Sequence, residues 1–278
     1  MKKIITSIIL CALFFTIIYS QDSRNGYYLA SDDTIRFFLV FAEVYNSPDD
    51  PGNQPNWSVG QMPSDADEYF DSEFTDENSI NGYLTKYFYQ SSFGNLIVLG
   101  DYYDSLIRID WNTIKNNYGE KEIISFLNSL PGSDIETAHG YKVNGTDFDK
   151  WEPTNNYMPK NQSDNDFIDF FVIVWRNNHK ICGSGTFGCG RTGSNLLSPI
   201  KNKSGADAFT WIKSHNSAAY TTLRHEYAHQ LLGGNNYHSG GAGAGVGNFL
   251  SDMGGYSILA SYNKSMEGPN AWDRWRLG

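Results

Sequence analysis

The sequence has no run of basic residues beyond Lys2 and Lys3, and its 21 Lys and Arg against 31 Asp and Glu give a net charge of −10 over 278 residues. A protein that binds nucleic acid needs a basic surface to neutralise phosphates, so we do not expect a nucleic-acid partner. Internal repeats are also missing, which excludes a repeat architecture. No second long apolar run follows the one at the N-terminus, so no membrane-spanning helix is expected in the rest of the chain.

The N-terminal residues have the pattern of a secretory signal peptide. After the two lysines, Ile4–Tyr19 is apolar apart from three serine or threonine residues, and a polar stretch begins at Asp22. We predict that residues 1–20 are a signal peptide removed after Ser20, which makes the protein secreted. A membrane anchor is the alternative, but the run is short for one. We therefore expect no stable membrane insertion after cleavage.

Cysteine is scarce. Cys11 lies inside the predicted signal peptide, which leaves Cys182 and Cys189 in the mature chain. A close pair in an exported protein predicts a disulfide. Half of a metal site is the less favoured alternative, because no further cysteine exists to complete a thiolate zinc site.

Strand-like and helix-like segments alternate along the chain. The predicted strands are Thr34–Val44, Asn95–Gly100 and Asp166–Trp175, and the predicted helices are Ser79–Ser91, Glu120–Leu130 and Ser217–Leu232. Between the first strand and the first helix, Asn46–Pro63 carries four prolines and is predicted to be a long surface loop. This alternation predicts an α/β protein with a twisted, mostly parallel sheet and helices packed on it.

The most informative pattern is His225-Glu226-x-x-His229, which falls within the last predicted helix. Residues four apart on a helix share a face, so two imidazoles at this spacing can bind one Zn²⁺. Glu226 is rotated about 100° from His225, where it can act as a general base toward a water molecule. Apolar residues at i, i+4 and i+8, namely Leu223, Tyr227 and Leu231, predict a separate face of this helix that packs on the core.

A catalytic zinc site usually has three protein ligands, so a third ligand must come from outside this helix. His238 is the first candidate, because a chain reversal at Gly233-Gly234 could bring it back under the ion. Asp252 is a rival and Glu267 a weaker one.

Calcium is a second candidate cofactor, because acidic clusters such as Asp49-Asp50 and Asp164-Asn-Asp166 fall in predicted loops. Neither cluster has the spacing of a defined calcium loop. Solvated surface charge is therefore the favoured interpretation.

Together with the zinc pattern, three further segments resemble one family. The aromatic stretch Tyr87–Leu96 runs into a Ser-Phe-Gly strand entry, the strand Phe167–Trp175 precedes the zinc helix, and Ala271–Gly278 is a Trp-containing segment that ends in Leu-Gly. In these features the chain resembles the zincin metallopeptidases, and within them secreted bacterial enzymes like immune inhibitor A.

The resemblance implies a zincin-like α+β fold with a twisted mixed sheet, an active-site helix and a small irregular C-terminal subdomain. Residues 21–232 would then form the N-terminal part of the catalytic domain and residues 233–278 the subdomain. Because relatives continue past such an ending, the resemblance implies either a truncated subdomain or a missing downstream region. A protein or peptide substrate is implied to lie extended along a sheet edge above the zinc.

Two departures from the family pattern affect the ligand and turn assignments. Leu232 and Asn235 stand where an extended family motif has Gly and His, so His238 is proposed from its reach and not from the motif's register. The methionine turn beneath the metal corresponds either to Met253 or, in a second alignment, to a segment with Ile258 in its place. Candidate donors to the developing oxyanion are Tyr237, Tyr256 and Tyr262.

The leading hypothesis is a secreted zinc-dependent endopeptidase in which Glu226 is the general base. The alternative is an exported glycan- or protein-binding module with a non-catalytic zinc site, in which the abundant aromatic residues stack on sugars. A zinc hydrolase for other bonds is a minor third hypothesis. The sequence leaves the oligomeric state and the cleavage specificity open.

Overall fold

The computed structural model describes residues 33–47, 57–114, 118–152, 161–162, 164–182, 189–213 and 217–232, and the structural statements below concern these residues. The predicted signal peptide, residues 1–20, and the predicted C-terminal subdomain, residues 233–278, lie outside them.

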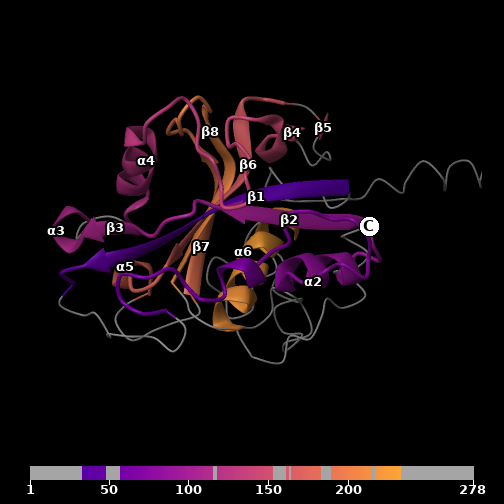
Figure 1. Cartoon of the computed structure of the whole chain (residues 1–278), viewed down its shortest axis with the longest axis horizontal. Coiled ribbons are helices and arrows are strands. Elements are labelled where there is room, and N and C mark those ends of the chain that lie inside the picture. The colour runs from indigo at the N-terminus through magenta and orange to yellow at the C-terminus, as the bar shows by residue number, and fades with distance from the viewer. Residues whose placement is uncertain are drawn as a thin grey trace, which may run out of the picture.

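Six strands form one mixed sheet (Figure 1). Five of them follow in the order β2 (Leu96–Tyr102), β1 (Asp33–Tyr45), β6 (Phe167–Trp175), β8 (Gly205–Lys213) and β7 (Cys189–Leu196). The sixth, β3 (Ile107–Asp110), pairs with the end of β1. All pairs are parallel except β7 with β8, so β7 is an antiparallel strand at one edge of the sheet. The predicted α/β class with a twisted mixed sheet is therefore confirmed.

The two central strands explain why the sequence signal for a sheet is strong. β1 and β6 are buried on both faces almost throughout. A parallel strand covered on both sides needs an apolar residue at nearly every position, and both segments are dense in Phe, Ile and Val.

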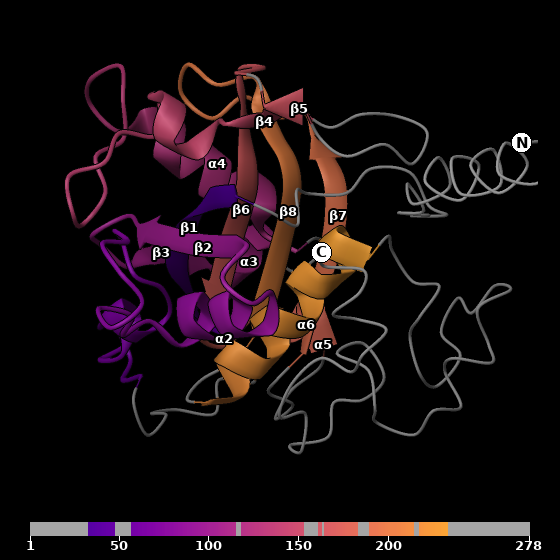
Figure 2. The same cartoon turned by 90° about the vertical axis from the view of Figure 1, so that its right-hand side faces the viewer.

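Helices cover the two faces of the sheet. Figures 1 and 2 show α2 (Tyr83–Ser91) and α6 (Ser217–Leu232) on one face and α4 (Glu120–Ser129) on the other. The short elements are η1 (Ala66–Glu68), α3 (Trp111–Ile114), η2 (Thr146–Phe148), α5 (His179–Cys182), and a two-stranded ribbon of β4 (Trp151–Glu152) and β5 (Asn161–Gln162). Within the described part of the chain, no helix combines the length and the apolar character needed to cross a membrane.

The hydrophobic core is divided by the sheet into two clusters. Alternate side chains of β1 enter opposite clusters: Phe37 and Leu39 pack with α2 and α6, whereas Phe38 and Val40 pack with α4. Burying both sets at once fixes the register of β1, because a shift by one residue would exchange the two faces.

The predicted surface loop over Asn46–Pro63 is only partly described. In its described part, Trp57 is buried against Phe41, with ring centroids 5.6 Å apart, and donates from Nε1 to the carbonyl of Gln61 at 2.9 Å. The residues after Trp57 still form an irregular turn in which Val59, Gly60 and Gln61 are exposed, so the indole of Trp57 anchors a surface loop to the core.

Candidate functional site

The helix that carries the zinc pattern has the bounds predicted from the sequence, Ser217–Leu232. Its predicted core face is also confirmed, because Leu223, Tyr227 and Leu231 are all buried in the cluster between α6 and the sheet. The ring of Tyr227 lies 4.6 Å from that of Phe37 and 5.0 Å from that of Phe88, measured between centroids. These contacts fix the rotation of α6 about its own axis.

Positions 225 and 229 lie within this continuous helix, one turn apart and separated by about 6 Å along the axis. Position 225 is about 200° from position 227 around the helix, so it lies away from the face that Tyr227 presents to the sheet. The His225 side chain is nevertheless only 1% exposed. The side chain of His229 and all of His238 lie outside the described residues, so the three-imidazole ligand set stays a prediction.

Glu226 is held against the edge of the sheet. Its side chain is 3% exposed and packs over Gly190 of β7. A Cβ added at Gly190 would lie 2.9 Å from Cγ of Glu226 and 2.8 Å from Cγ2 of Ile212. Burial raises the pKa of Glu226 to about 8, because the charged carboxylate loses its hydration.

Further contacts anchor α6 at both ends. Toward its C-terminal end, Gln230 donates from Nε2 to Oγ1 of Thr192 in β7 at 2.8 Å. Near its start, the hydroxyl of Tyr220 donates to Oδ2 of Asp65 at 2.8 Å. On the side toward α2, the guanidinium of Arg224 lies 4.4 Å from the ring centroid of Tyr87. The helix is thus fixed to β7, to the segment before η1, and to α2.

Gly190 is a site residue that the sequence analysis did not identify. A glycine inside a strand can mark a close approach of another group to the backbone, but Gly190 lies among several other glycines in the sequence. β7 itself was also not predicted, so the glycine had no strand to interrupt.

Cys189, at the start of β7, is disulfide-bonded in the structure. The side chain of Cys182, the predicted partner, is not among the described side chains, so the pairing itself stays a prediction. The backbone is compatible with it, because α5 ends at Cys182 and contacts β7.

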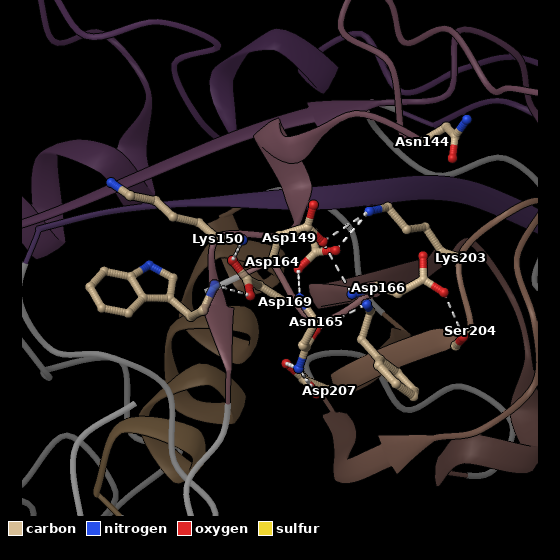
Figure 3. A network of polar contacts seen from close by, with 12 residues as sticks. Asn144, Asp149, Lys150, Asp164, Asn165, Asp166, Asp169, Lys203, Ser204 and Asp207 are labelled. Atoms are coloured by element: carbon tan, nitrogen blue, oxygen red, sulfur yellow. Dashed lines mark hydrogen bonds and ion pairs between the residues drawn. The ribbon is translucent and has the colours of Figure 1, made fainter. Parts of the chain in front are cut away.

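One of the two acidic clusters considered for calcium lies before β6, and Figure 3 shows it engaged with a lysine. Lys203 Nζ contacts Oδ2 of Asp149 at 2.7 Å and Oδ1 of Asp164 at 3.9 Å. The ammonium thus supplies positive charge between these two carboxylates. Asp166 bonds elsewhere, accepting from the hydroxyl of Ser204 at 2.7 Å. The other cluster, Asp49-Asp50, lies outside the described residues.

The described residues contain no group of three or more His, Cys, Asp or Glu side chains arranged to hold a metal ion. A scan against protein-family models finds no match for the chain, and a search of curated proteins finds no significant relative. The resemblance to zincin metallopeptidases therefore rests on the sequence pattern alone and stays a prediction.

Proposed function

We propose that the protein is an exported zinc-dependent endopeptidase whose general base is Glu226. The observation that carries the proposal is the setting of that residue: a nearly buried carboxylate on α6, one position after His225, packed against the edge strand β7. A carboxylate on the same helical turn as potential metal ligands, held in one position by its packing, is placed as a general base would be.

The donor set fits a zinc ion by its chemistry. Two histidines one turn apart on a regular helix are a common zinc-binding pair, and His225 and His229 would hold the ion together with His238. When bound there, the ion would supply Lewis-acid chemistry that polarises the scissile carbonyl and activates a water molecule. Asp252 and Glu267 remain the alternatives for the third ligand.

In this mechanism the chain's own residues orient the reaction and move the proton. The Glu226 carboxylate takes a proton from the attacking water and delivers it to the leaving amine. Burial of its side chain against Gly190 excludes bulk water from one side of the carboxylate. The core contacts of Tyr227 and the bond between Gln230 and Thr192 keep α6 in a fixed position during the reaction.

β7 is the expected binding strand for an extended substrate. β7 pairs with β8 on one side, and no described strand pairs with its other side. α6 contacts β7 directly. A peptide can add to such an edge through main-chain hydrogen bonds. The substrate would then lie beside the strand that also contacts Glu226.

The alternative of a sugar-binding module receives no support from the described aromatic side chains. Trp57, Trp151, Trp175 and Trp211 are buried, so they contribute to the core and do not form a stacking platform. Among the described residues, Tyr45, Tyr83 and Phe93 are the exposed large aromatic side chains. Most of the described tryptophan side chains thus belong to the hydrophobic core.

The test is the variant Glu226→Gln in the full chain, assayed for casein digestion and for bound zinc. We expect zinc to be retained and hydrolysis to fall by about 10²–10⁴-fold, which is the usual contribution of a general base. Glu122→Gln, on α4 at the opposite face of the sheet, is the matched control and should retain full activity. Wild-type protein that binds zinc but cleaves nothing would support the binding module, and full activity of Glu226→Gln would remove Glu226 from its role.

A further inference from the structure

A polar cluster lies at the carboxyl end of β2, where β1 changes its neighbour. β1 pairs with β2 along its first half and with β3 at its end. Between these two strands, Tyr103 forms a β-bridge with Thr137, so the loop that contains Thr137 crosses the gap. Asp101 of β2, His139 of this loop and Asp67 of η1 converge there.

The Asp101 carboxylate fixes the imidazole of His139. Asp101 is fully buried, and its Oδ1 accepts from the backbone N–H of Tyr102 at 2.8 Å, while its Oδ2 accepts from the hydroxyl of Thr137 at 2.6 Å. Oδ1 also contacts Nδ1 of His139 at 2.8 Å. Because this carboxylate acts as an acceptor throughout, Nδ1 carries the hydrogen in the neutral ring, and the lone pair is left on Nε2.

A second carboxylate lies near this nitrogen. Nε2 of His139 lies 3.7 Å from Oδ1 of Asp67, and the same Oδ1 accepts from the hydroxyl of Tyr102 at 2.6 Å. A separation of 3.7 Å is too long for a hydrogen bond. Two ligand atoms that each bind one tetrahedral ion at 2.0–2.2 Å are about 3.4 Å apart. The separation between Nε2 and Oδ1 is close to that distance.

Solvent reaches both proposed ligands, so water can complete the coordination of an ion held between them. The side chains of His139 and Asp67 are 41% and 71% exposed.

We propose that His139 Nε2 and Asp67 Oδ1 form a two-residue site for a divalent transition-metal ion, separate from the zinc pattern on α6. Asp101 is the positioning residue, since a histidine ligand commonly donates its other ring N–H to a carboxylate. One imidazole and one carboxylate suit Zn²⁺, Ni²⁺ or Cu²⁺, with water at the remaining positions. With two protein ligands, the site is smaller than the three-residue groups that the described part of the chain lacks.

Such an ion would connect parts of the fold that are far apart in sequence. It would join η1 to the loop that contains His139, and Asp65, next to η1, already binds Tyr220 of α6. Occupancy would therefore tie this loop to the start of the helix that carries the zinc pattern.

The test is a calorimetric titration of the full, chelator-treated chain with NiCl₂. We expect a binding step that persists in His225→Ala but disappears in His139→Ala and weakens in Asp67→Asn. Asp101→Asn should lower its affinity by about 10–100-fold, because the amide donates to Nδ1 and moves the ring hydrogen to Nε2. His179→Ala is the matched control, because this imidazole packs against Trp111, with ring centroids 4.1 Å apart, and is not part of the cluster.

Two results would overturn the proposal. One is Ni²⁺ binding by His139→Ala with the stoichiometry and affinity of the wild type. The other is unchanged affinity in Asp67→Asn, an exposed substitution that should leave the fold intact and would show that His139 and Asp67 form only an ion pair. Unchanged affinity in a folded Asp101→Asn variant would contradict the positioning role of Asp101.

Discussion

Gly190 matters at the scale of single residues because its missing side chain makes room for Glu226. Sequence reasoning assigned chemistry to Glu226 from its place in the His-Glu-x-x-His pattern. It could not assign a role to Gly190, because the contact joins residues 36 positions apart through the packing of α6 on β7. The same holds for Asp101 and His139, which are adjacent only because the loop crosses the end of β2.

Substituting Gly190 by alanine should lower hydrolysis by at least 10-fold in the proposed peptidase. The added Cβ would meet Cγ of Glu226 at 2.9 Å and Cγ2 of Ile212 at 2.8 Å, so the carboxylate has to move. Small misplacements of a catalytic group have large effects on rate. Casein digestion, measured together with the free energy of unfolding, checks this prediction.

Gly193→Ala is the matched control in the same strand. Its Cβ would also meet a side chain at 2.8 Å, but that neighbour is Phe209, which packs in the cluster on the other face of the sheet. Both variants should lose about 1–3 kcal/mol of stability through overpacking, but Gly190→Ala should lose much more activity than Gly193→Ala, because only its Cβ displaces Glu226. Equal losses of activity in the two would mean that Gly190 has no specific relation to the site.

At the scale of elements, the sequence predicted those segments whose pattern is set locally. β1 and β6 are long apolar runs, and α6 has an apolar face at helical spacing, so each was recognised close to its observed bounds. β7 was missed because its sequence, Cys-Gly-Arg-Thr-Gly-Ser-Asn-Leu, has little strand propensity. It forms a strand because β8 pairs along it and α6 covers it, which are tertiary effects.

The segment between β7 and β8 is joined to the turn after η2 by a buried ion pair, and Lys203→Met should break it. The Nζ of Lys203 lies 2.7 Å from Oδ2 of Asp149, and both side chains are almost fully buried. Removing the ammonium leaves a buried carboxylate without its charge partner, which typically costs about 3–5 kcal/mol. Urea unfolding at pH 7 measures the loss.

A second lysine–aspartate pair in the structure provides the comparison. Lys150 and Asp33 are 3.0 Å apart, but both side chains are partly exposed, so Lys150→Met should cost less than about 1 kcal/mol. In the Lys203→Met background, replacing Asp149 by leucine should restore much of the lost stability, because no buried charge then remains. A loss for Lys203→Met as small as that for Lys150→Met would show that the buried pair does not stabilise the loop.

At the scale of the whole molecule, the class of the fold was predictable but the strand order was not. Alternating helices and strands indicate an α/β sheet from local patterns alone. The order β2-β1-β6-β8-β7 depends on pairings between distant segments, such as β1 with β6, whose paired residues are 133 positions apart. The two-sided core explains that order, because the apolar strands β1 and β6 occupy the centre, where both faces are covered.

The stability of the whole molecule should depend on pH through Asp149. Burial and the contact with Asp164 raise the pKa of Asp149 to about 6 from its ordinary value of 3.8, although Lys203 and the N–H of Asn165 act in the opposite direction. Between these two values the folded state holds a proton that the unfolded chain has released. The contribution of Asp149 to the free energy of unfolding is therefore present below about pH 4 and is lost as the pH rises to about 6.

Asp149→Asn isolates this effect, because the amide does not titrate. We expect the free energy of unfolding of the wild type to fall relative to that of Asp149→Asn between pH 4 and pH 6, and the difference to be constant above about pH 7. Asp164 has a lowered pKa, so its own contribution changes at lower pH and stays outside this interval. Urea titrations of both proteins at intervals of half a pH unit provide the comparison. Parallel curves between pH 4 and pH 6 would mean that Asp149 is already ionised throughout this range, held in that state by Lys203.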